Sequence, residues 1–268
     1  MLFYAFVALF VLLTVLPLLW VFKMSIVSSG ELTAPTPTIL PHTLTDSSYR
    51  TIFSDPSFKK SIVNSAVIAG FTTVVCLVIG AFAAYALARL TFTFRGPVMS
   101  LILAIAFFPA VAIIAPLFLQ FQKFGILDTY WGMIVPDTLF ALPLTVYLLV
   151  AYFRELPQDL EEAAKVDGAS TLQAFRKVTL PLSVPGVVTT GLLTFIYAWN
   201  EFLFANTFSF TPRSQPATVR IPLFAGEHTV NYGAQAAASI AVTVPLVILV
   251  LIFQRRIVSG LTAGASTG

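Results

Sequence analysis

Six long stretches of this chain carry almost no charge, and no other feature of the sequence constrains its fold as strongly. Asp, Glu, Lys and Arg are absent from 2–22, 61–88, 96–122, 178–200 and 229–254, and 129–153 contains only Asp137. A helix needs about 20 apolar residues to cross the hydrocarbon core of a bilayer. The stretches are continuously apolar, which argues against strands that alternate with a period of two. The sequence therefore predicts an all-α membrane protein with six transmembrane helices, at about 2–24, 60–89, 96–121, 131–153, 182–205 and 232–255.

Composition supports a membrane location and argues against other classes. Hydrophobic residues make up 57% of the chain and charged residues 10%, whereas roughly a quarter of the residues in a soluble domain are charged. The net charge is +3 and the basic residues are scattered, so we expect no nucleic-acid partner. The single cysteine, Cys76, lies in an apolar run and is predicted to pack as a small hydrophobic residue.

The first stretch is predicted to be a retained span and not a cleaved signal peptide. No basic residue precedes its apolar run, and no small-residue cleavage site follows it. External loops are expected at 25–59 and 206–231. The first is rich in Ser, Thr and Pro, with a short helix near 49–53, and prolines discourage a long helix in the second.

Four prolines in the third and fourth expected spans predict bends. Pro109, Pro116, Pro136 and Pro143 each remove a backbone hydrogen bond from a regular helix. Such breaks are tolerated in membranes where the freed backbone groups face protein or a water-filled path. The prolines therefore favour helices that bend around a translocation route.

Charge bias decides the orientation of the bundle only narrowly. With the N-terminus inside, eight of the 15 Lys and Arg residues lie in cytoplasmic segments and seven in external ones. Long external segments count little in the positive-inside rule, and Arg255 and Arg256 directly follow the last stretch. We expect both termini on the cytoplasmic side of the bacterial inner membrane.

The loop at 154–181 is the most polar part of the chain and predicts two short helices. Pro157 suits the opening of the first, and the acidic residues after it complement the positive end of its dipole. Gly168 can end that helix in the left-handed conformation. Ser170 followed by Gln173 is a capping-box pattern that starts the second helix, and Pro181 limits it.

Each short helix has an apolar side, which leaves two interpretations of the loop. Ala163 and Ala164 are small enough for another backbone to approach, so the first helix would fit a groove on a soluble partner. Alternatively, both helices form an amphipathic turn that returns the chain to the bilayer. The residue pattern alone does not favour either interpretation.

The segment 162–181 resembles the EAA signature of binding-protein-dependent ABC importer permeases. That signature is Glu-Ala-Ala, three residues, Gly, nine residues and Ile-x-Leu-Pro, and Val178 stands here at the Ile position. The resemblance implies a type I importer permease fold and a cytoplasmic coupling-helix loop that docks in a cleft of a separate ATPase. The residues it implies for docking are Glu161, Glu162, Ala163, Ala164, Asp167, Gly168, Leu180 and Pro181.

The chain is also similar to carbohydrate permeases of the maltose-permease type, through 16–20, 153–157 and 198–202. Its tail at 253–265 is similar to those of actinobacterial disaccharide importers of the trehalose type. This resemblance implies a sugar cargo, such as trehalose or maltose, moved by alternating access. It also implies a second homologous permease, an ATPase dimer and an extracytoplasmic sugar-binding protein as partners, within the lipid membrane.

The sequence shows no motif for catalysis by the chain itself. It has no phosphate-binding loop ending in Gly-Lys-Ser/Thr. Its two histidines, His42 and His228, fall in expected external loops. We therefore expect a non-catalytic permease without a metal or directly bound cofactor, whose ATP and Mg²⁺ are held by the partner ATPase.

Asp137 and Glu201 are candidate residues of a solute path, because ionisable groups at membrane depth usually face a cavity or a partner. Tyr197, Trp199 and Asn200 lie beside Glu201 in sequence and offer aromatic and hydrogen-bonding contacts to a sugar. The alternative is structural: Asp137 caps a helix near the outer interface, and Glu201 has a similar role.

Three other functions fit the sequence less well. An ABC permease for glycerol phosphate or an amino acid uses the same machinery, but phosphate favours a basic path and the uncharged stretches contain no Lys or Arg. An ion-coupled secondary transporter needs no docking loop and more often shows inverted repeats. A membrane-embedded enzyme is disfavoured by the shortage of catalytic groups.

Overall fold

The computed structural model describes residues 2–36, 38–225 and 230–263, with side chains as far as Gln254. The described residues are almost entirely helical, and their one strand-like feature is an isolated antiparallel bridge between Val27 and Leu44. His228, the end of the tail from residue 264 and the side chains of Arg255 and Arg256 lie outside this description. The all-α prediction is confirmed.

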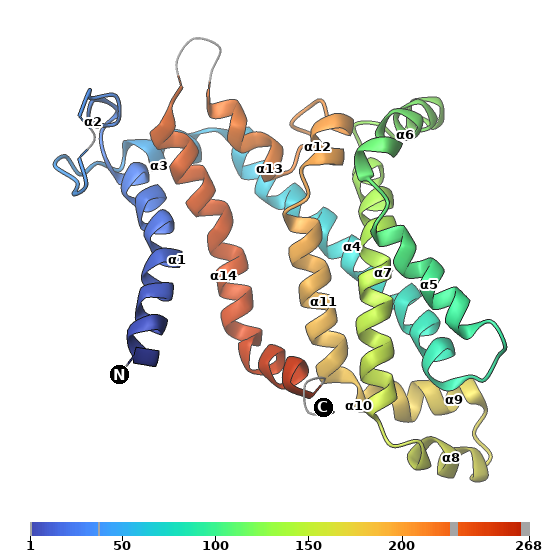
Figure 1. Ribbon diagram of the computed structural model, residues 1–268. Helices are drawn as coiled ribbons and strands as arrows, with labels where there is room; N and C mark the ends of the chain where they lie inside the picture. The colour runs from blue at the N-terminus through green and yellow to red at the C-terminus, as the bar shows by residue number, and fades with distance from the viewer. Residues whose placement is uncertain (1, 37, 226–229, 264–268) are drawn as a thin grey trace.

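The helices follow one another with short connections (Figure 1). In chain order they are α1 (Leu2–Ile26), α2 (Ser29–Leu32), α3 (Ser47–Ser54), α4 (Pro56–Arg89), α5 (Arg95–Ala106), α6 (Ala110–Phe124), α7 (Trp131–Glu155), α8 (Asp159–Val166), α9 (Thr171–Ala174), the π-helical turn η1 (Phe175–Thr179), α10 (Leu180–Leu182), α11 (Val184–Trp199), α12 (Leu203–Phe208), α13 (Ala217–Arg220), the 3₁₀ turn η2 (Ile221–Ala225) and α14 (Tyr232–Ala263).

Among the described residues, four helices are long and apolar enough to cross a membrane: α1, α4, α7 and the part of α14 up to Gln254. Two further spans arise if each of two bent pairs is counted as one. These pairs are α5 with α6, bent by 85°, and the stretch from α9 to α10 with α11, bent by 77°.

The third expected span is therefore not one straight helix. α5 ends at Ala106, and α6 restarts at Ala110 with Pro109 as its N-cap residue. A proline disfavours helical backbone in the residue before it and lacks an N–H to donate, which explains the break at Pro109. Pro116, Pro136 and Pro143 lie inside α6 and α7, which continue through them. Of the four prolines expected to bend the spans, only Pro109 separates two described helices.

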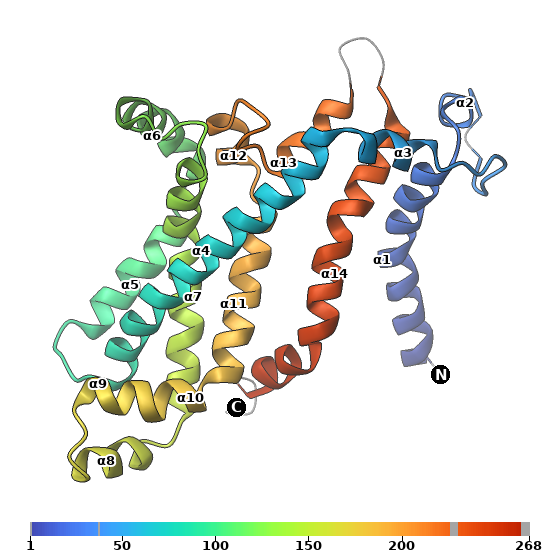
Figure 2. The same cartoon turned by 180° about the vertical axis from the view of Figure 1, so that it is seen from behind.

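The core of the bundle lies where α4 crosses α7 and α11 packs against both (Figures 1 and 2). Small residues allow this close packing. A methyl group at Gly80 of α4 would lie 3.0 Å from Thr145 of α7, and one at Gly191 of α11 would lie 2.9 Å from Leu77 of α4. Cys76 is fully buried and its Sγ lies 3.8 Å from the carbonyl oxygen of Thr138, which confirms the prediction of a packed cysteine.

The two edges of the bundle are formed by different elements. α1 lies beside α14 at one edge, and α5 and α6 form the other (Figures 1 and 2). Ser25 is the only buried residue of α1. The apolar side chains along the rest of α1 are exposed by the chain itself, as suits a helix surrounded by lipid or by a neighbouring subunit.

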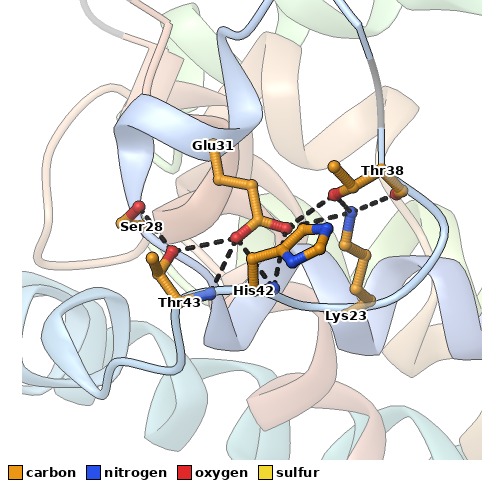
Figure 3. A network of polar contacts seen from close by, with 6 residues as sticks. All are labelled: Lys23, Ser28, Glu31, Thr38, His42 and Thr43. Atoms are coloured by element: carbon orange, nitrogen blue, oxygen red, sulfur yellow. Dashed lines mark hydrogen bonds and ion pairs between the residues drawn. The ribbon is translucent and has the colours of Figure 1, made fainter.

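A cluster around Glu31 organises the loop between α1 and α3 (Figure 3). The Glu31 carboxylate accepts hydrogen bonds from the Thr38 hydroxyl at 2.7 Å, the His42 backbone N–H at 3.2 Å and the Thr43 backbone N–H at 3.0 Å. Lys23 Nζ lies 3.5 Å from Glu31 Oε1. The hydrogen bond from Thr38, together with those from Thr43 and His42, lowers the pKa of Glu31 to about 2. This otherwise irregular loop is thus held in one conformation.

The short helix expected near 49–53 is confirmed as α3. In the second expected external loop, the described residues form only the short elements α13 and η2 after α12 ends at Phe208. Pro216 is the N-cap residue of α13, and Pro222 lies inside η2. Residues 226–229 of that loop lie outside the described residues.

Candidate functional site

The polar loop places α8 and α9 beyond one end of the bundle, on the side where α1 begins and α14 ends (Figure 1). The first helix, α8, carries three acidic residues in its first turn and Lys165 in its last. This charge order complements the helix dipole. The helix begins at Asp159, two residues after Pro157, with Gln158 as its N-cap residue.

Gly168 ends this helix as the sequence predicts. Its φ angle is +88°, in the left-handed region that favours glycine. The backbone N–H of Gly168 donates to Lys165 O at 3.0 Å, and that of Ala169 donates to Ala164 O at 2.9 Å. These bonds satisfy carbonyl groups that the end of the helix leaves free.

The capping box at Ser170 is also confirmed. The Gln173 backbone N–H donates to Ser170 Oγ at 3.3 Å, and the Ser170 backbone N–H donates to Gln173 Oε1 at 2.8 Å. The helix that starts here continues through the π-helical turn η1 and ends at Leu182, one residue after Pro181. The chain then bends by 77° at Ser183 into α11.

Most of the residues expected to dock the ATPase are accessible. Glu162, Ala163, Asp167, Gly168 and Pro181 are exposed, and Ala164 and Leu180 are half-buried. Exposed apolar side chains lie next to them, with Leu160 47% and Leu172 52% accessible. A hollow of about 340 Å³ opens between the two short helices and is lined by Ala164, Asp167, Gly168, Ala169, Gln173, Ala174, Lys177 and Val178.

Glu161 departs from the expectation that it meets the ATPase, because its side chain turns inwards and is 4% exposed. Its carboxylate accepts hydrogen bonds from Tyr85 Oη at 2.5 Å and Thr179 Oγ1 at 3.3 Å, and Lys165 Nζ lies 2.9 Å away. Burial raises the pKa of Glu161, but the bonds from Tyr85 and Lys165 outweigh it and leave this pKa below its ordinary value. Successive residues point about 100° apart around a helix, so Glu162 points in a different direction from Glu161, and its side chain is exposed.

The alternative in which Asp137 caps a helix is wrong. Asp137 lies inside α7 and is 1% exposed. Within the described part of the chain, neither carboxylate oxygen of Asp137 has a hydrogen-bond partner. Buried carboxyl groups normally have such partners. Asp137 interacts electrostatically with Glu201 and with Tyr197, which brings three of the five candidate path residues into one region.

Glu201, in contrast, has the structural role that the alternative interpretation assigns to it. Its carboxylate accepts hydrogen bonds from the backbone N–H groups of Phe204 at 2.7 Å and Ala205 at 3.0 Å, at the start of α12. Glu201 lies where the expected span 182–205 is divided, since α11 ends at Trp199 and α12 begins at Leu203.

The three candidate path residues at the end of α11, Tyr197, Trp199 and Asn200, differ in exposure. Tyr197 is 40% exposed, and Asn200 is exposed with its side-chain amide donating to Ile196 O at 2.7 Å. Trp199 is 4% exposed and packs against Phe195 in the core cluster that includes alanines of α14. Of this sequential group, Tyr197 and Asn200 are exposed on the surface of the chain, and Trp199 is buried in its core.

Asp128, which no sequence pattern identifies, connects two parts of the chain at the end opposite α8. Its carboxylate accepts hydrogen bonds from the backbone N–H groups of Phe210 and Thr211, at 2.9 and 3.0 Å, and from the Ser214 hydroxyl at 2.6 Å. Burial raises the pKa of Asp128, but the hydrogen bonds from Ser214 and Thr211 outweigh it and leave this pKa below its ordinary value. Because the partners are more than eighty residues away, no local pattern identifies this contact.

Beside Asp128 lies a hollow of about 350 Å³ at the same end of the molecule. Its lining includes an exposed aromatic residue, Trp131, and two cationic residues, Lys60 and Arg213. The molecule therefore has two short, accessible helices with a hollow between them at one end and an aromatic, basic hollow at the other. This arrangement defines a class of helical membrane protein with a folded polar loop that is open to a partner.

Comparison with known proteins agrees with this class. Residues 76–262 match the family described as binding-protein-dependent transport system inner membrane component, and the chain belongs to this family. It is 44% identical over 255 residues to a trehalose transport system permease protein of Mycobacterium tuberculosis, covering 94% of this chain and 92% of that protein. It is 41% identical over 223 residues to a trehalose/maltose transport system permease protein of Thermococcus litoralis, covering 82% of this chain and 80% of that protein.

The fold is similar to that of a solved bacterial ABC transporter involved in the import of the acidic polysaccharide alginate. The TM-score is 0.79 at 25% sequence identity, and the match covers 94% of each chain. A match to a chain of an inward-facing methionine ABC transporter has a TM-score of 0.59 at 17% identity and supports the fold alone. The chain is thus an inner-membrane component of a binding-protein-dependent transporter, with the ABC permease fold.

Proposed function

We propose that this chain is one of two homologous permease subunits in an ATP-driven importer of a di- or oligosaccharide such as trehalose or maltose. The observation that carries the proposal is the exposed face of α8, with Glu162, Ala163 and Gly168, next to the 340 Å³ hollow. The names of the relatives in Mycobacterium tuberculosis and Thermococcus litoralis support a sugar as the cargo.

In this proposal α8 inserts into a cleft of the ATPase, and the end of the bundle that carries it faces the cytoplasm. The beginning of α1 and the end of α14 then lie on the cytoplasmic side (Figure 1). The permease has no catalytic role of its own. ATP and Mg²⁺ belong to the ATPase dimer, whose closure moves the docked loop and switches the bundle between inward-open and outward-open states.

The opposite end would receive the sugar from an extracytoplasmic binding protein. The hollow lined by Lys60, Trp131 and Arg213 supports this assignment, because aromatic residues and arginine are enriched at protein interfaces. Asp128 fixes the loop that carries Arg213. Between the two ends, the region of Asp137, Glu201 and Tyr197 is the proposed solute path, since carboxylates and an aromatic hydroxyl can hydrogen-bond to sugar hydroxyl groups.

A test of docking compares the permease with Glu162→Arg and Gly168→Pro after coexpression with the ATPase encoded nearby. Both substitutions are expected to abolish copurification of the ATPase, because one reverses a charge on the docking face and the other reshapes its turn. Asp46→Arg is the matched control, since Asp46 has a 65% exposed side chain on the loop at the opposite end. ATPase recovery equal to wild type for both loop variants would refute docking at α8.

The cargo is tested separately on the cognate binding protein. We expect a disaccharide, with trehalose and maltose tried first, to raise its melting temperature more than glycerol 3-phosphate does. Stabilisation by glycerol phosphate and not by any sugar would replace the sugar assignment without affecting the docking proposal.

A further inference from the structure

The first docking helix is attached to the membrane-spanning helices through one charged side chain. Of the eight described residues of α8, only Glu161 is buried. Leu160 is 47% and Val166 87% exposed, so apolar packing of α8 against the rest of this chain is limited. The attachment instead depends on polar contacts of the Glu161 carboxylate, which we call the Glu161 cluster and define as Glu161, Tyr85, Arg89, Lys165 and Thr179.

The Glu161 cluster joins α8 to the last turns of α4. Tyr85 donates to Glu161 Oε1 at 2.5 Å, and Arg89 Nε lies 3.6 Å from Glu161 Oε2. Both partners are buried, with Tyr85 5% and the Arg89 side chain 4% exposed. Arg89 Nη2 also donates to Leu156 O at 2.7 Å, in the connection between α7 and α8. The end of α4 therefore contacts both α8 and the segment that leads into it.

A second part of the Glu161 cluster reaches the other side of the loop. Thr179, in the π-helical turn, donates to Glu161 Oε2 at 3.3 Å. Just before it, Phe175 packs its ring 4.7 Å from that of Tyr85 and 6.2 Å from that of Phe153 of α7, measured between centroids. Tyr85 thus contacts α8 through its hydroxyl and the π-helical turn through its ring.

Hydrogen bonds differ from apolar packing in that they are directional. An apolar contact allows a helix to roll or slide at little cost, whereas bonds to both carboxylate oxygens set the rotation of α8 about its own axis. That rotation decides which residues of α8 face outwards. Glu161 is therefore placed to transmit displacement of α8 to α4, which packs against both α7 and α11 in the core of the bundle.

We propose that the Glu161 cluster is the mechanical connection through which movement of the docked α8 drives α4, with Glu161 as a positioning residue that does not contact the ATPase. This inference rests on the proposed docking of α8. It goes beyond docking because it separates two neighbouring acidic residues by role: Glu162 binds the ATPase, and Glu161 couples the bound ATPase to the transmembrane helices.

The test uses the reconstituted transporter with its second permease, its ATPase dimer and its binding protein loaded with trehalose, or with maltose if trehalose does not stabilise that protein. Tyr85→Phe removes only the hydroxyl, and Glu161→Gln keeps the shape of the side chain without its charge. Tyr147→Phe is the matched control, because Tyr147 is 48% exposed on α7. Glu162→Gln is the contrasting variant on the docking face.

We expect Tyr85→Phe and Glu161→Gln to copurify with the ATPase as wild type does and to keep basal ATP hydrolysis within about twofold. Stimulation of hydrolysis by the loaded binding protein should fall about tenfold, the effect of losing one hydrogen bond to a charged group. Glu162→Gln should instead lose ATPase during purification, and Tyr147→Phe should behave as wild type.

The inference is overturned if both Glu161-cluster variants retain stimulation and sugar uptake within about twofold of wild type. It is also overturned if they lose the ATPase as Glu162→Gln does, since Glu161 would then only shape the docking face. If Glu162→Gln leaves ATPase binding unchanged, Glu162 does not bind the ATPase. The results for Tyr85→Phe and Glu161→Gln then still decide whether the Glu161 cluster couples α8 to α4. Tyr85→Phe is the milder change and keeps the test decisive if Glu161→Gln reduces expression.

Discussion

Replacing Gly168 by alanine isolates the contribution of one backbone turn to ATPase docking. A Cβ atom at Gly168 would meet no other atom within 4 Å, so the substitution introduces no clash. The only penalty is conformational, because φ is +88° and an L-residue in the left-handed region costs about 1–2 kcal/mol. The turn is exposed in the free permease and can relax, but docking requires its original shape. The conformational free-energy cost of the alanine therefore weakens binding of the ATPase.

With a factor of ten for each 1.4 kcal/mol, that penalty corresponds to a Kd for the ATPase dimer that is about 5- to 30-fold weaker. The assay is biolayer interferometry with the permease pair in nanodiscs and the ATPase dimer in solution. Gly125→Ala is the matched control, because Gly125 also ends a helix, has φ of +67° and has no atom within 4 Å of the added Cβ. The helix that Gly125 ends, α6, lies at the other end of the bundle from α8 (Figure 1). Equal Kd values for both variants and wild type would refute the reasoning that docking requires this turn.

Further predictions concern packing, pH dependence and the solute path. Gly186→Ala should destabilise the bundle by about 1–3 kcal/mol, because the added methyl group would lie 2.4 Å from the ring of Tyr152. We expect a lower melting temperature in detergent, and an unchanged melting temperature would contradict this packing. Glu31→Gln should lower the melting temperature at pH 7. Because folding lowers the pKa of Glu31 from 4.5 to about 2, its stabilising effect is complete above pH 4.5 and is lost as the pH falls towards 2. The difference from wild type should therefore shrink between pH 5 and pH 3, measured by thermal unfolding, and a constant difference would show that Glu31 is not the titrating group. Asp137→Asn should leave the melting temperature unchanged or higher, since neither carboxylate oxygen has a protein partner among the described residues. If this carboxylate binds sugar hydroxyl groups, the same substitution should reduce trehalose uptake about tenfold. Uptake equal to wild type would show that Asp137 is not part of the solute path.

The sequence by itself determined the features that depend on neighbouring residues. Membrane class follows from hydropathy summed over about 20 consecutive positions. The turn at Gly168 and the capping box at Ser170 and Gln173 follow from contacts within a few residues, and the structure confirms both. The break at Pro109 has a local cause too, although the sequence did not show which of four prolines would separate two helices.

The tertiary structure decided the features that depend on distant residues. Glu161 and Glu162 are identical in type and adjacent, but Glu161 alone meets Tyr85, 76 residues away, and Arg89 at the end of α4. Asp137 is an interior residue of α7, not a cap, because α4 packs along α7 and buries it. Asp128 fixes a loop more than eighty residues further along the chain. A pattern in sequence records which side chains can form such bonds, whereas packing of the helices determines which of them meet.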